Sequence, residues 1–77
     1  MASTHPEVRR FRSEELGGRL LTREEAGEAI FGKGVLGNEL GVGPLPSLAR
    51  QLAKAYRWRE YEAAWFVLTG DAPPFGS

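Results

Sequence analysis

The segment that most constrains the fold is residues 57–71, RWREYEAAWFVLTGD, which turns from charged to continuously apolar before it stops at Gly70. As a helix it carries two apolar stripes. One stripe consists of Ala63, Phe66 and Val67. The other consists of Tyr61, Ala64, Trp65 and Leu68. Because a helix that is apolar nearly all round is a buried helix, we expect this one to be covered on two sides.

What covers the second stripe is left open by the sequence. The chain has 77 residues, ten of them glycine, and no cysteine, so it forms one small domain without disulfides, and such domains are marginally stable. Either residues 8–45 cover the stripe, or it is the surface on which a second copy or another protein docks. The second alternative makes the chain a non-catalytic interaction module with a partner interface at Tyr61, Ala64, Trp65 and Leu68.

Capping and breaking signals predict an all-α fold, a small bundle of three to four helices within a domain spanning residues 8–70. Thr22 and Glu25 match a capping box for a helix over residues 23–31, and Ser47 is a plausible N-cap for a third helix. A weaker cap, Ser13, follows an extended segment over residues 8–12. Gly70 supplies a left-handed end for the last helix, residues 59–68. Residues 1–7 are expected to be disordered, residues 32–46 to form a glycine-rich loop, and residues 71–77 to be a tail or linker.

Residues 49–68 resemble a helix-turn-helix motif within the predicted pair of helices at 47–68. The matching positions, which should lock the two helices together, are Leu52, Ala53, Tyr56, Trp58, Ala63 and Phe66. Arg57 departs from the motif, which usually has glycine at the turn. The resemblance implies a DNA-binding regulator whose second helix enters the major groove. That helix offers Glu60, Glu62 and Trp65 to the DNA, which makes it a poor recognition helix.

Basic residues gather on the face of the third predicted helix that is opposite to its apolar stripe. Arg50, Lys54 and Arg57 recur at helical spacing, and Arg59 follows them. They are candidate phosphate contacts for the alternative function, a small helix-turn-helix DNA-binding transcriptional regulator. An ordinary solvated helix face is the favoured explanation, and the chain has no net charge, with ten basic and ten acidic residues. Arg9, Arg10 and Arg12 form either a basic arm or a solubilising terminus.

Catalysis and cofactor binding are not expected. The single histidine, His5, lies near the N-terminus, so neither a His-based triad nor a histidine metal cluster is available. The phosphate-loop lookalike GEAIFGKG at residues 27–34 lacks the final Ser or Thr and the preceding strand. No apolar run approaches the roughly 20 residues of a membrane helix. These features predict a soluble cytoplasmic protein without metal or cofactor.

The segment WREYEAAWFVLTGDAPP, from Trp58 onward, resembles parts of short bacterial proteins of unassigned function. The resemblance implies a bacterial or mobile-element origin and implies no activity.

Overall fold

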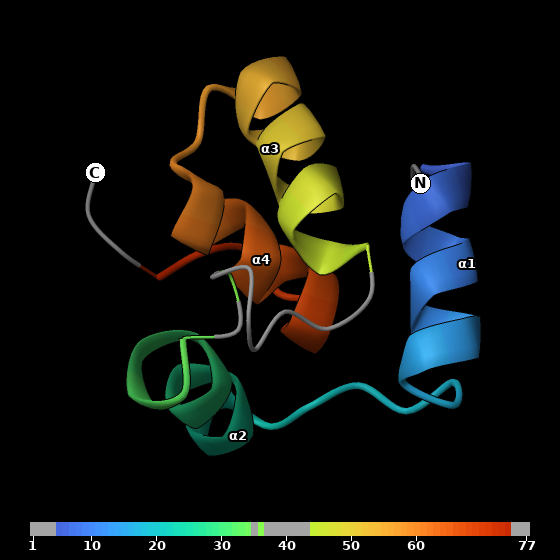
Figure 1. Ribbon diagram of the computed structural model, residues 1–77, viewed down its shortest axis with the longest axis vertical. Coiled ribbons are helices and arrows are strands. Elements are labelled where there is room, and N and C mark those ends of the chain that lie inside the picture. Colours follow the sequence, from blue (N-terminus) through green and yellow to red (C-terminus); the bar gives the residue numbers. More distant parts are fainter. Residues whose placement is uncertain (1–4, 35, 37–43, 75–77) are drawn as a thin grey trace.

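The computed structural model describes residues 5–34, 36 and 44–74. This part of the chain is all-helical, as predicted, and contains no strand. Its elements in chain order are α1 (Pro6–Glu15), α2 (Arg23–Gly27), a π-helical turn η1 (Glu28–Gly32) that continues α2, α3 (Leu45–Tyr56) and α4 (Glu60–Thr69). Figure 1 shows α4 in the middle of the molecule, with α1, α2 and α3 arranged around it.

The central helix α4 is buried on both of its apolar stripes, and every other helical element packs against it. Its buried side chains are Ala63, Ala64, Trp65, Val67, Leu68 and Thr69. The Thr69 hydroxyl donates to the Trp65 carbonyl oxygen at 2.8 Å, so this buried polar group has a partner. The chain itself therefore covers the second stripe.

Helix α1 differs from the prediction. It begins at Pro6, before the predicted domain boundary at residue 8, and includes the segment expected to be extended. Proline is favoured in the first turn of a helix because its φ angle is already helical. Val8 and Phe11, three residues apart, both enter the core. Ser13 is therefore not an N-cap and lies in the last turn of the helix.

The predicted capping box of α2 is confirmed. The Thr22 hydroxyl accepts from the Glu25 backbone N–H at 3.1 Å, and the Glu25 carboxylate accepts from the Thr22 backbone N–H at 2.9 Å. The helix then widens into η1, where the Lys33 N–H donates to the Glu28 carbonyl oxygen at 2.7 Å. Ala26 and Ile30 bury the inner face of this continuous helix.

Helix α3 begins at Leu45, so Ser47 lies inside the helix and Pro44 occupies the cap position. Its buried face consists of Leu45, Leu48, Ala49 and Leu52. Tyr56, which was expected to lock the two helices together, is exposed, and so is its neighbour Ala55. Figure 1 shows that the end of α3 projects beyond α4 before the chain turns back.

The remaining predicted boundaries concern the loop and the termini. Gly32 belongs to η1, and Leu45 and Pro46 belong to α3, so the loop is shorter at both ends than predicted. Its residues 35 and 37–43 lie outside the described residues, as do 1–4 and 75–77. Gly70 ends α4 with a φ of 81°, as predicted, and residues 71–74 follow without helix. None of the helices in the described part of the chain is long and apolar enough to cross a membrane.

Candidate functional site

The predicted partner interface on α4 does not form an open surface. Ala64, Trp65 and Leu68 are 0%, 6% and 2% exposed, which places them in the core of the single chain. Tyr61 is half-buried and meets the Phe31 ring edge-on, with centroids 5.7 Å apart. The expectation that this stripe faces outward is corrected, because α1, α2, η1 and α3 all pack on α4. A partner would reach it only if those elements moved away.

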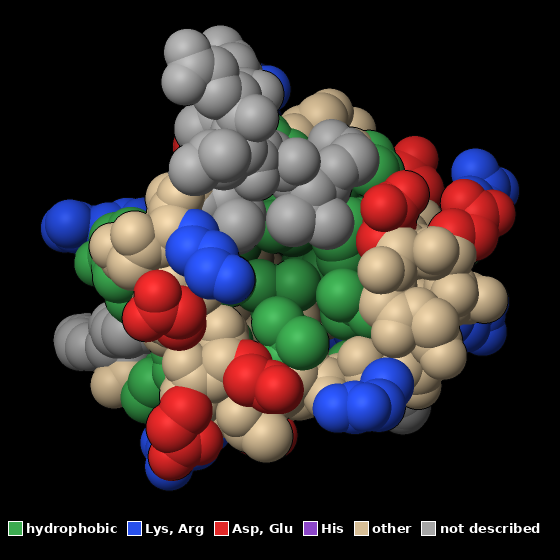
Figure 2. Space-filling model, turned by 60° about the horizontal axis from the view of Figure 1, so that its bottom comes forward, with side chains coloured by type: hydrophobic (Ala, Val, Ile, Leu, Met, Phe, Trp, Pro, Cys, Tyr) green, Lys and Arg blue, Asp and Glu red, His purple; other side chains and the backbone are tan. Residues whose placement is uncertain are grey.

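Exposed apolar side chains lie elsewhere in the described part of the chain. They are Leu20 after α1, Phe31 in η1 and Tyr56 at the end of α3. Figure 2 views the molecule from the side that is lowest in Figure 1, and on this face hydrophobic side chains gather at the centre within a ring of both positive and negative charges. The ring therefore has no single sign that would select a charged ligand.

A charge of one sign dominates an open groove of about 580 Å³ between α3 and the start of α4. We call it the basic groove, and its lining residues are Ser47, Arg50, Gln51, Ala53, Lys54, Trp58, Arg59 and Glu60. Three of the four predicted phosphate contacts, Arg50, Lys54 and Arg59, therefore share one hollow. The fourth, Arg57, is exposed in the turn that joins α3 to α4.

Local structure explains why these cations converge. Arg50 and Lys54 are four residues apart on α3, so they share one face of the helix. The chain reverses within three residues, which places Arg59 at the N-cap of α4 beside them. There the Arg59 backbone N–H donates to the Glu62 carboxylate at 2.7 Å, so this carboxylate is held at the backbone. The groove thus collects side chains from two helices that pack tightly together.

The described part of the chain does not neutralise the cations of the groove. Among the described residues, no carboxylate lies within ion-pair distance of Arg50, Lys54, Arg57 or Arg59. Glu60 is the single acidic residue that lines the groove. An anion that enters would meet several cations and one carboxylate, so the groove has the electrostatic character of an anion-binding surface.

The turn at the end of α3 holds a strained residue. Arg57 has φ 60° and ψ 38°, and it is the only residue other than glycine with a positive φ in the part of the chain that the structure describes. The conformation lets the Trp58 N–H donate to the Ala53 carbonyl oxygen at 2.9 Å, which closes the helix end. A side chain in this region costs about 1–2 kcal/mol. Glycine would avoid that cost, and the position instead presents a guanidinium to solvent.

An aromatic column, not predicted from the sequence, stands beside the groove. Tyr56 stacks on Trp58, with ring centroids 4.9 Å apart and an interplanar angle of 29°. Trp58 contacts Phe66 with centroids 5.6 Å apart, and the Arg12 guanidinium lies 5.2 Å from the Phe66 centroid. Trp58 thus belongs both to the groove lining and to the column.

Arg12 anchors the column and does not belong to a basic arm. Its Nε donates to the Val67 carbonyl oxygen at 2.9 Å and its Nη2 to the Phe66 carbonyl oxygen at 2.8 Å. Partial burial lowers the pKa of Arg12 from its ordinary value, and the group stays protonated because arginine does not lose its proton in proteins. A cation is favourable here because the last carbonyls of a helix carry partial negative charge. Arg9 and Arg10 are exposed on α1.

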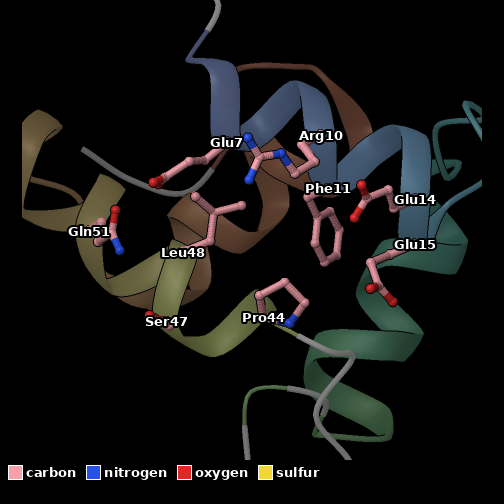
Figure 3. A pocket seen from close by; sticks show the side chains of 9 residues that line it. All are labelled: Glu7, Arg10, Phe11, Glu14, Glu15, Pro44, Ser47, Leu48 and Gln51. Carbon is pink, nitrogen blue, oxygen red and sulfur yellow. The ribbon is translucent and has the colours of Figure 1, made fainter.

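A second hollow, of about 230 Å³, lies between α1 and α3 and is acidic (Figure 3). Its charged lining consists of Glu7, Glu14 and Glu15 with Arg10, all from α1. Ser47 and Gln51 line both hollows. This side of α3 therefore separates a mainly negative hollow from a positive one.

Other kinds of site are not seen in the described residues. Within residues 5–34, 36 and 44–74, no three His, Cys, Asp or Glu side chains are grouped so that they could hold a metal ion. Comparisons with models of known families, with curated proteins and with solved structures found no match. In the part of the chain that the structure describes, the fold and the groove define a small all-helical domain with an open cationic groove between α3 and the start of α4.

Proposed function

We propose that this domain is a non-catalytic nucleic-acid-binding module whose basic groove contacts the phosphate backbone. The observation that carries the proposal is the convergence of Arg50, Lys54 and Arg59 on one groove, where they form no ion pair with a carboxylate of the described residues. Arg57 extends the series at the turn. Contacts to phosphate fix a protein on nucleic acid and supply most of the sequence-independent affinity.

The length of the cationic series favours a polymer over a single small anion. Arg50 and Lys54 are about 6 Å apart along the axis of α3, and Arg57 and Arg59 continue beyond its end. The four groups are thus spread along α3 and the turn that follows it. A chain of phosphates can contact them in succession, and arginine and lysine are the usual partners of backbone phosphates.

The proposed contact surface is α3 and the turn, which differs from a helix-turn-helix protein that inserts its second helix into DNA. Helix α4 is buried on both stripes, so it has no face to insert. For the same reason, the alternative of a protein interface through Tyr61, Ala64, Trp65 and Leu68 is not part of this proposal.

Charge reversal in the groove tests the proposal. We expect the unaltered protein to bind a fluorescently labelled mixed-sequence oligonucleotide, supplied as single strand and as duplex, at low salt in an anisotropy titration. The double variant Arg50→Glu with Lys54→Glu should lose this binding. The matched control is Arg19→Glu with Arg23→Glu, which changes the net charge equally at exposed positions outside the groove.

The control variant should retain most of the affinity, and circular dichroism should show that both variants keep their helices. Equal loss in the two variants would mean that net charge alone drives binding. Absence of binding by the unaltered protein to either form of the oligonucleotide would refute the proposed function.

A further inference from the structure

We propose that the basic groove selects single-stranded nucleic acid and that one base stacks on Tyr56. This inference deepens the proposed function and rests on it. It joins two features that lie side by side: the row of unpaired cations and the aromatic column that ends in an exposed ring.

The shape of the cationic surface favours a single strand. The hollow is lined by Arg50, Lys54 and Arg59, so these cations do not lie on a protruding surface. A duplex is read by an element that protrudes into one of its grooves, most often a helix in the major groove. Helix α4 is covered by the rest of the chain and does not protrude. A single strand, in contrast, is narrow and flexible enough to follow a hollow lined by positive charge.

Tyr56 has the form of a stacking platform. One face of its ring lies on Trp58, and 49% of the residue remains exposed to solvent. Tyr56 is the last residue of α3, and the end of this helix projects beyond α4 (Figure 1). Every base has a flat π-face, so stacking on such a ring binds a strand without selecting its sequence.

The Tyr56 ring is supported by the other members of the aromatic column. Trp58 rests on Phe66, and Arg12 caps Phe66 while its hydrogen bonds fix the guanidinium to the end of α4. A ring supported in this way loses little freedom when a base stacks on it, which favours binding. The column therefore connects the exposed ring to the core of the domain.

Charge around the platform confines the strand. Tyr56 stacks on Trp58, and Trp58 lines the basic groove together with Lys54 and Arg59, so a strand in the groove passes beside the aromatic column. On the other side of Ser47 and Gln51, the acidic hollow with Glu7, Glu14 and Glu15 repels phosphates. The favourable path runs through the basic groove toward the turn.

The test compares three labelled phosphodiesters of the same length, roughly 12 nucleotides, within the range that small single-strand-binding domains cover. They are a mixed-sequence single strand, an abasic strand and a duplex, each titrated with the unaltered protein by anisotropy at the same salt concentration. Stacking of a single base should make the single strand bind roughly fivefold or more tightly than the abasic strand. The single strand should also bind more tightly than the duplex.

Variants assign this preference to the ring. Tyr56→Leu should reduce the affinity for the single strand to that for the abasic strand, and it should leave the affinity for the abasic strand unchanged. Tyr56→Phe keeps the ring and should keep the preference. The matched control is Phe31→Leu, which removes another exposed ring away from the groove and should not change the ratio of the two affinities.

The outcomes separate the two proposals. A duplex that binds as tightly as the single strand overturns the inference and leaves the proposed function standing. The same holds for equal binding of the single strand and the abasic strand, and for an unchanged preference in Tyr56→Leu. If none of the three phosphodiesters binds, the proposed function fails and the inference fails with it.

Discussion

Helices α3 and α4 both end at a residue in the left-handed conformation, but this residue is arginine in α3 and glycine in α4. Gly70 ends α4 with φ 81° and ψ −1°, and Arg57 ends α3 with φ 60° and ψ 38°. At Gly70 the left-handed conformation favours glycine, and a Cβ atom would lie 2.8 Å from Leu20 Cδ1, so the end of this exposed side chain would have to move. At Arg57 the conformation favours glycine, and an exposed arginine is present.

The two helix ends differ because one belongs to the core and the other to the surface. The end of α4 is tied to the rest of the chain by Arg12 and by the Leu21 N–H, which donates to the Leu68 carbonyl oxygen at 2.8 Å. The end of α3 projects beside the basic groove (Figure 1). The comparison suggests that glycine at the end of α4 contributes to stability. Arginine at the end of α3 instead contributes to the positive charge beside the groove.

Removal of the Arg12 guanidinium should have the largest effect on stability. Arg12→Met keeps an apolar stem and deletes both hydrogen bonds to the end of α4, and hydrogen bonds from charged groups contribute about 1.5 kcal/mol or more each. We expect the free energy of unfolding, measured by urea denaturation, to fall by about 3 kcal/mol. Arg9→Met removes the same charge from an exposed position of α1 and should change it by about 0.5 kcal/mol or less. Similar losses in both variants would mean that the hydrogen bonds from Arg12 do not stabilise the end of α4.

Gly70→Ala should have the next largest effect, because it combines backbone strain with displacement of the Leu20 side chain from the end of α4. We expect a loss of about 2 kcal/mol in the same denaturation experiment. Gly18→Ala is the matched control, since Gly18 has φ 80° and no atom within 4 Å of its Cβ position. That variant should lose about 1 kcal/mol, from backbone strain alone. If the two losses are equal, the packing of Leu20 on the end of α4 contributes nothing.

Arg57→Gly should have the smallest effect and the opposite sign. Relief of the left-handed strain should stabilise the domain by about 1 kcal/mol. Arg57→Ala removes the same charge and keeps the strain, so its stability should stay within about 0.5 kcal/mol of the unaltered protein. Thermal unfolding of the three proteins in parallel makes the comparison. Equal stabilities of the glycine and alanine variants would contradict the claim that the left-handed conformation at residue 57 costs free energy.

Local chemistry accounts for what the sequence predicted of the fold. The capping box at Thr22 and the left-handed end at Gly70 depend on residues a few positions apart, so they are readable from the chain. The first helix was missed because its apolar residues, Val8 and Phe11, are surrounded by charges, and its most specific contacts are distant. Arg12 bonds to carbonyls 54 and 55 residues away, a pairing that no local pattern reveals.

The candidate site was predictable in part for the same reason. Helical spacing identified the exposed cations Arg50 and Lys54, because their positions follow from the helix alone. Tyr56 has the spacing of a core residue and was assigned to the core. Its exposure depends on how far α3 extends beyond α4, which is set by tertiary packing. The burial of the second stripe of α4 likewise depends on how α1 and α2 fold back over it.

The most direct test of the account is the salt dependence of single-strand binding by the unaltered protein and by Arg57→Gly. Four cations on phosphates predict that the logarithm of the binding constant falls against the logarithm of salt concentration with a slope of about −3, since each contact contributes about −0.7. Arg57→Gly should bind more weakly, with a slope shallower by about 0.7, even though its fold is more stable. A flat salt dependence of the unaltered protein, or an identical slope and affinity in the variant, would contradict the claim that these cations hold a phosphate backbone.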